Sequence, residues 1–127
     1  MTQAAADALQ ERLVLFAVKI IDLVSYLPRT TTGRHVAGQV LRSGTSPAPN
    51  YAEARGAESR ADFVHKLRIG VKELNETGIW LLIVLKARMV PEALATSLVT
   101  ENRELARILS ASIKTAQAKG LQRPNDK

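Results

Sequence analysis

The sequence predicts an all-α protein, an antiparallel up-down bundle of four helices. Apolar residues recur at spacings of three and four over four segments of roughly 20 to 30 residues, and short connections separate these segments. No segment alternates polar and apolar residues as a half-buried strand does. The length of 127 residues fits one domain. We place the bundle domain at residues 1–119 and a disordered C-terminal tail at residues 120–127.

The first helix is expected from about residue 4 to residue 27. Pro28 ends it, because the residue before a proline avoids helical backbone angles. Its apolar stripe follows the spacing of a packed helix face, with members Leu9, Leu13, Phe16, Ile20, Leu23 and Leu27. Thr32 is the expected N-cap of the second helix, which begins near Gly33.

The third and fourth helices carry clear start signals. Ser59, with Asp62 three residues later, resembles a capping box and begins a helix that runs to about Met89. Pro91 suits the first turn of the last helix. We expect the inner face of that helix to contain Leu94, Leu98, Leu105, Ile108, Leu109 and Ser112.

Residues 42–56, RSGTSPAPNYAEARG, contain two prolines and two glycines. Steps of three and four from the second helix nevertheless stay in phase across them, which predicts one long second helix kinked at Pro47 and Pro49. The prolines remove the amide donors for the carbonyls of Ser43 and Thr45. We expect these carbonyls to find other donors, with candidates Asn75, Arg42 and Trp80, and the small side chains around Gly44 to admit a neighbouring helix.

The same stretch, followed by ESRADFVHKLRIGVKELNETGIWL, resembles the four-helix bundle proteins known from intervening sequences in bacterial 23S ribosomal RNA genes. The matching residues are Arg42, Ser43, Ser46, Asn50, Ala52, Glu53, Asp62, Phe63, Glu73 and Glu76. The resemblance implies a homo-oligomer, commonly a pentameric ring, in a family without established catalytic activity. A more distant similarity is to accessory proteins of diversity-generating retroelements, basic pentameric bundles that bind nucleic acid and a reverse transcriptase.

The sequence contains no complete motif for catalysis, metal binding or cofactor binding. Residues 33–38 have the glycine spacing of a phosphate loop, but Gln39 follows where lysine is required. Asp62 and His65 come nearest to the Glu-x-x-His pairs of metal-binding bundles. Glu53 and Glu73 could act as an acid–base pair, although the preferred interpretation is hydrogen bonding to the open carbonyl region or ion pairing with Arg42 and Lys72. We predict no catalytic residue, no metal and no cofactor.

We expect a cytoplasmic protein without a membrane segment. The chain has no cysteine, which suits a reducing compartment. Its longest apolar run, residues 79–85, is far short of the ~20 residues of a membrane span. Asp7 and Glu11 precede the first apolar run, unlike the basic start of a signal peptide.

The net charge of +6 favours a polyanionic partner, RNA or DNA. Two groups of cations are candidate nucleic-acid contacts. Arg103, Arg107 and Lys114 lie within about 40° of each other on the last helix, while Arg55 and Arg60 flank the turn into the third. The alternative is a solvated face whose charge serves solubility. Aromatic residues make up only 4% of the chain, so phosphate contacts rather than base stacking are expected.

Surplus apolar surface favours self-association. Residues 79–85 place apolar groups on every side of the third helix, and Leu15 lies among polar residues of the first. A single bundle needs only one buried stripe per helix, so the surplus predicts burial against another subunit. The alternative is an uneven monomeric bundle.

Two functions remain open. The first is a non-enzymatic accessory protein that binds nucleic acid as a homo-oligomer, most simply a pentamer. The second is an oligomeric scaffold that binds other proteins, such as a reverse transcriptase, with no nucleic-acid role. An enzyme is the least supported class.

Overall fold

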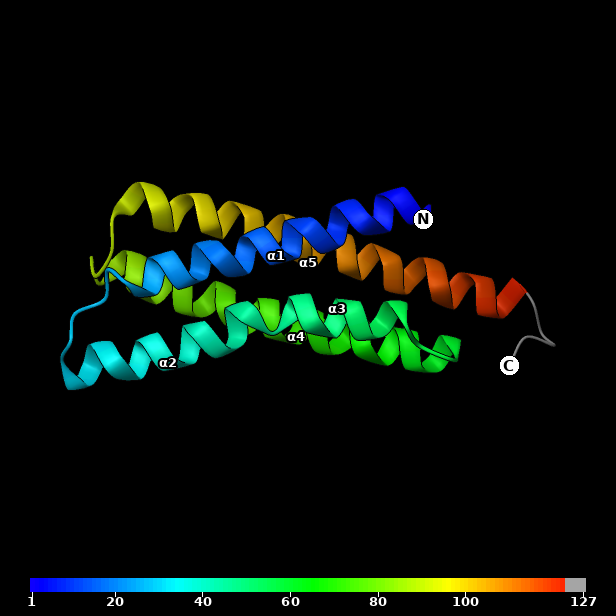
Figure 1. Cartoon of the computed structure of the whole chain (residues 1–127), viewed down its shortest axis with the longest axis horizontal. Helices are drawn as coiled ribbons and strands as arrows, with labels where there is room; N and C mark the ends of the chain where they lie inside the picture. Colours follow the sequence, from blue (N-terminus) through cyan, green and yellow to red (C-terminus); the bar gives the residue numbers. More distant parts are fainter. Residues whose placement is uncertain (123–127) are drawn as a thin grey trace.

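The computed structural model describes residues 1–122, which form a four-helix bundle (Figure 1). The helices are α1 (Gln3–Val24), α2 (Thr31–Thr45), α3 (Pro47–Arg55), α4 (Arg60–Lys86) and α5 (Glu92–Gln122). The described residues include no strand. Helices α2 and α3 are the two halves of the predicted bent helix, so the prediction of an antiparallel up-down bundle is confirmed.

The bundle places α1 and α4 on a diagonal. Helix α5 packs against both α1 and α4, and the α2–α3 unit packs against the same two helices from the other side, whereas the backbones of α1 and α4 lie farther apart (Figure 1). The start of α1 and the end of α5 therefore lie at the same end of the bundle. None of the helices in residues 1–122 is long and apolar enough to cross a membrane.

Helix α1 buries the predicted stripe, but it ends three residues early. Leu9, Leu13, Phe16, Ile20 and Leu23 are at most 4% exposed. After Val24 the amides of residues 25–27 donate to carbonyls three residues back, so the chain tightens into a turn before Pro28. Leu27 remains buried beyond the helix end.

Thr30, not Thr32, caps α2. Its Oγ1 accepts a hydrogen bond of 3.1 Å from the amide of Gly33. Three consecutive threonines can each act as a cap, and the first of them does so here. A β-carbon on Gly33 would lie 1.8 Å from the Pro28 carbonyl oxygen, which requires a glycine in this first turn.

The α2–α3 junction is the predicted kink. Ser46 keeps helical angles, φ −71° and ψ −36°, and its carbonyl accepts from the amide of Asn50 at 3.2 Å. The predicted donors to the carbonyls of Ser43 and Thr45 are wrong. Arg42 and Trp80 donate instead to the carboxylates of Glu73 and Glu76, and Asn75 is exposed. Polar side chains nevertheless bridge the bend to α4, since the hydroxyls of Thr77 and Ser43 are hydrogen-bonded at 2.9 Å in the buried core.

Close approach of α1 at the bend is confirmed. A β-carbon on Gly44 would lie 2.8 Å from Ile20 Cγ1 and 2.9 Å from its Cγ2. Gly44 is buried, and Ile20 is completely so. The absence of a side chain at residue 44 therefore sets the distance between α1 and α2.

Helix α4 begins as predicted and ends early. Ser59 Oγ accepts from the amide of Asp62 at 3.0 Å. The helix stops at Lys86 because Arg88 adopts a left-handed φ of 57°. Helix α5 starts after Pro91, whose carbonyl accepts from Ala95, and it continues through Gln122. The tail predicted at residues 120–127 thus begins inside α5, and its last five residues lie outside the described part.

Candidate functional site

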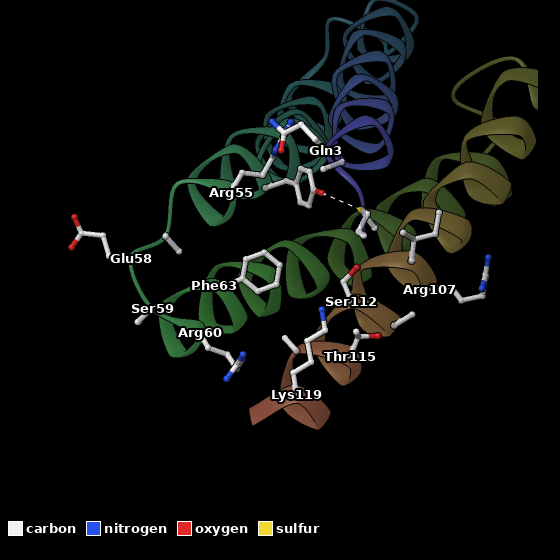
Figure 2. Close-up of a pocket in the computed structure, with 17 residues that line it drawn as sticks. Gln3, Arg55, Glu58, Ser59, Arg60, Phe63, Arg107, Ser112, Thr115 and Lys119 are labelled. Atoms are coloured by element: carbon white, nitrogen blue, oxygen red, sulfur yellow. Dashed lines mark hydrogen bonds between the residues drawn. The ribbon is translucent and has the colours of Figure 1, made fainter. Parts of the chain in front are cut away.

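A pocket of about 880 Å³ lies at the end of the bundle that contains both the start of α1 and the end of α5. It opens between the end of α3, the start of α4 and the second half of α5 (Figure 2). Small and apolar side chains form much of its wall, among them Phe63, Ile108 and Ala111. We call this cavity the end pocket.

Four cations from three helices line the end pocket: Arg55, Arg60, Arg107 and Lys119. Three of them belong to the predicted set of nucleic-acid contacts. Figure 2 shows Arg60 on α4 across from Lys119 on α5, with the hydroxyls of Ser112 and Thr115 on the same α5 wall. Arg107 lies at the rim and points away from the other cations (Figure 2).

The four cations differ in how far neighbouring carboxylates neutralise them. Arg55 donates to Asp7 at 2.7 Å and to Gln10 at 2.9 Å, which ties α3 to α1. Arg107 pairs with Glu104 one turn earlier, and this contact lowers the pKa of the Glu104 carboxyl. Lys119 is exposed and makes no ion pair with the described residues. Of the two α5 cations, only Lys119 therefore has no carboxylate partner among the described residues.

Lys119 is the cation of the end pocket that sequence reasoning missed. Ser112, Thr115 and Lys119 follow each other at spacings of three and four, which places them on one face of α5. That spacing is the available signal in the sequence. The spacing alone does not show that Lys119 lies near Arg60, because this depends on the fold placing the end of α5 beside the start of α4.

The other two predicted contacts lie elsewhere. Lys114 is exposed on α5 and does not line the end pocket. Arg103 is also exposed and borders a second, smaller cavity between α4 and α5. The predicted stripe of Arg103, Arg107 and Lys114 is thus solvent-facing, but only Arg107 reaches the end pocket.

The acidic residues considered for acid–base chemistry are engaged in ion pairs. Arg42 donates to Glu73 at 2.9 Å and also to Glu76, joining the bend to α4. Glu53 accepts from Lys66 at 3.0 Å, rather than from Lys72. The Arg42 and Trp80 donors lower the pKa of the Glu76 carboxyl. The ion-pair interpretation of Glu73 is confirmed. Across the described part of the chain, no three histidine or carboxylate side chains form a group that could hold a metal.

Apolar side chains are exposed on two helices outside the end pocket. On α1, Val14, Leu15, Val18 and Ile21 are 41–56% exposed, and on α4, Ile79 and Ile83 are 59% and 41% exposed. The surplus that the sequence indicated thus lies on the surface of the single chain.

A groove of about 290 Å³ adjoins the exposed residues of α4. It runs between α4 and α5 and is lined by Ile79, Leu82, Val99 and Ala106 together with polar neighbours. At its floor Asn102 is 4% exposed and donates from Nδ2 to the Leu74 carbonyl at 2.9 Å. Its Oδ1 atom is buried without a hydrogen-bond donor among the described residues.

Comparisons with known proteins agree on one family. The family model of the 23S rRNA-intervening sequence protein matches residues 8–111. A crystal structure of a protein of unknown function from the S23 ribosomal protein family of Bacteroides thetaiotaomicron VPI-5482 is 34% identical in sequence. It matches with a TM-score of 0.79, over 86% of this chain and 97% of that one. No curated protein sequence matches the chain.

Proposed function

The chain belongs to the 23S rRNA-intervening sequence protein family, and from this premise we propose that it is a non-enzymatic accessory protein that binds nucleic acid. The observation that carries the proposal is the end pocket, where Arg60 on α4 and Lys119 on α5 lie across from each other beside the hydroxyls of Ser112 and Thr115 (Figure 2). Such a site suits phosphate groups, since phosphate oxygens accept hydrogen bonds from Arg, Lys, Ser and Thr side chains.

The charge of the whole chain supports the same proposal. A net charge of +6 attracts a polyanion over distances longer than any single contact. Binding through phosphates positions a nucleic acid but carries no direct sequence information. We therefore propose backbone-directed binding of structured RNA or DNA with little dependence on sequence.

We further propose that the protein is a homo-oligomer, a pentameric ring as the resemblance implies. The exposed apolar residues of α1 and α4 support this, because monomeric proteins rarely leave large contiguous apolar patches in water. A ring would repeat the end pocket in each subunit, and several phosphates could then be neutralised by one particle.

The mass of the particle tests the assembly. Association would remove the exposed apolar side chains of α1 and α4 from water. The purified chain is therefore expected to run at about five times the 13.8 kDa chain mass. Light scattering coupled to size-exclusion chromatography measures this at micromolar concentration. A mass of 13.8 kDa would overturn the proposed oligomer.

Nucleic-acid binding is tested by fluorescence anisotropy with a labelled RNA hairpin and a labelled DNA duplex. Affinity should fall steeply with salt, with a log–log slope on duplex DNA of about −0.9 for each phosphate neutralised. The double variant Arg60→Glu/Lys119→Glu should bind both probes at least about tenfold more weakly, because it places carboxylates in the end pocket. Absence of binding by the wild type at low salt would contradict the proposal.

Two control variants locate the site. Arg29→Glu/Arg34→Glu makes the same charge change at the opposite end of the bundle and should reduce affinity far less. Arg103→Glu/Arg107→Glu tests the exposed stripe of α5. If only this last variant abolished binding, the nucleic acid would lie along α5 and not in the end pocket.

A scaffold that binds other proteins is the second candidate function, and the exposed apolar residues of α1 and α4 favour it. A reverse transcriptase is the partner that the distant resemblance to retroelement accessory proteins implies. This function gains support if the chain assembles as proposed but binds neither probe.

A further inference from the structure

Five of the exposed apolar residues form two separate outer faces. On α1, Val14, Val18 and Ile21 lie within about 60° of each other, on the side opposite the buried stripe. On α4, Ile79 and Ile83 lie about 40° apart and also oppose the buried side. We call these sets the α1 face and the α4 face.

The two faces point away from each other. Helices α1 and α4 occupy diagonal corners of the bundle, and their places in Figure 1 agree with this. One chain therefore cannot cover either face with the other. A symmetric dimer built on one face would leave the second exposed, whereas head-to-tail contact covers both on every chain and closes into a ring when the rotation allows.

The shapes of the two faces differ in a complementary way. The α1 face is the outward ridge of a single straight helix. The α4 face borders the groove of about 290 Å³ between α4 and α5, whose wall contains Leu82, Val99 and Ala106. Helix packing places the ridge of one helix into the groove between side chains of another, so an apolar side chain from the α1 face fits this groove.

Charges at the margins of the faces are also complementary. Glu11 and Asp22 flank the α1 face, about 16 Å apart along the helix. Lys72 and Lys86 flank the α4 face, about 21 Å apart. All four side chains are exposed, and none forms an ion pair with another described residue. Opposite charges at the rim of an apolar contact steer association and disfavour wrong pairings.

From these observations we infer that the α1 face of one chain docks on the α4 face and adjoining groove of a second copy. The contact is heterologous: each chain offers its α1 face to one neighbour and its α4 face to the other. This inference rests on the self-association proposed above and names the surfaces that produce it. It does not depend on nucleic-acid binding.

Two single variants test the inference by complementation. Val18→Glu damages the α1 face and Ile79→Glu damages the α4 face, so each variant alone should run as a 13.8 kDa monomer in light scattering. An equimolar mixture retains one intact pair of faces, Ile79→Glu offering α1 and Val18→Glu offering α4. The mixture should therefore form a 1:1 dimer and stop there, because the remaining faces would oppose two carboxylates.

Leu41→Glu is the matched control, since Leu41 is an exposed apolar residue on α2 that belongs to neither face. It should keep the wild-type mass. Circular dichroism checks that all three variants retain the helical content of the wild type. A charge exchange offers a second test: Lys72→Glu/Lys86→Glu should weaken assembly, and adding Glu11→Lys/Asp22→Lys to the same chain should restore it.

The possible outcomes separate the two proposals. A monomeric wild type would overturn both the oligomer and this inference. An oligomeric wild type whose mass is unchanged in Val18→Glu or Ile79→Glu would overturn the interface alone. Single variants that each run as a dimer would show that each face contacts the same face of another copy, and monomeric single variants that fail to pair on mixing would show that the two faces do not contact each other. Either result contradicts the head-to-tail contact.

Discussion

Gly44→Leu is expected to lower the free energy of unfolding by about 1–3 kcal/mol, the usual range for overpacking a well-filled core. Even a β-carbon at residue 44 would lie 2.8 to 3.0 Å from three side-chain carbons of Ile20. Ile20 is completely buried and cannot rotate into solvent. The larger side chain must therefore push α1 away from the bend. Urea denaturation at one fixed protein concentration measures the change, because assembly makes stability depend on concentration.

Gly38→Leu is the matched control for this prediction. Gly38 lies on the same helix, is exposed, and has no atom within 4 Å of the position of an added β-carbon. Its replacement should leave stability unchanged or raise it by up to ~1 kcal/mol, since leucine is a better helix former than glycine. Equal unfolding midpoints for Gly44→Leu and wild type would refute the close approach of α1 to the bend.

A double-mutant cycle locates the strain at Ile20. Ile20→Ala alone should destabilise the protein by about 2–5 kcal/mol through loss of buried volume. In the Gly44→Leu background the same truncation should cost much less, because the leucine fills the space that Ile20 vacates. Additive effects would place the strain of Gly44→Leu on another neighbour.

The helices and the bend were predictable because they follow from local rules. The stripe from Leu9 to Leu23 has the period of a helix, and the same period continues across Pro47. A proline at the start of a new helical segment loses no hydrogen bond that the segment needs. The sequence therefore predicted one bent helix, and Ser46 in the structure keeps helical angles at the junction.

The partners of polar groups were less predictable, because they depend on which helices become neighbours. Arg42 was expected to serve carbonyls freed by the kink, yet it reaches Glu73 and Glu76 on α4. A charged donor gains more from a carboxylate than from a neutral carbonyl. Arg42 can reach these carboxylates only because α4 lies beside the bend. The periodicity of the sequence alone does not determine which helices become neighbours.

The candidate site was predictable in part for the same reason. Arg55 and Arg60 are close in sequence and flank one turn, so their proximity could be predicted locally. Lys119 is 59 residues from Arg60 in the chain, and the two meet because the antiparallel order returns the end of α5 to the start of α4. The positions of Arg103 and Lys114 outside this pocket likewise depend on which surfaces of α5 the neighbouring helices cover.

The first turn of α2 leads to a second prediction. Gly33→Ala is expected to destabilise the protein by about 2 kcal/mol or more, at the upper end of overpacking effects. The new methyl group would lie 1.8 Å from the Pro28 carbonyl oxygen and 2.8 Å from its carbon. Both are backbone atoms, so relief requires the loop before α2 to move and not just a side chain to turn.

Gly38→Ala, five residues later on the same helix, should change the free energy of unfolding in the opposite direction. Nothing lies near an added β-carbon there, so this change should raise stability by roughly 0.5–1 kcal/mol through the better helix propensity of alanine. Thermal unfolding of the two variants at equal concentration makes the comparison. If both alanines stabilised the protein, the loop would have room at Gly33.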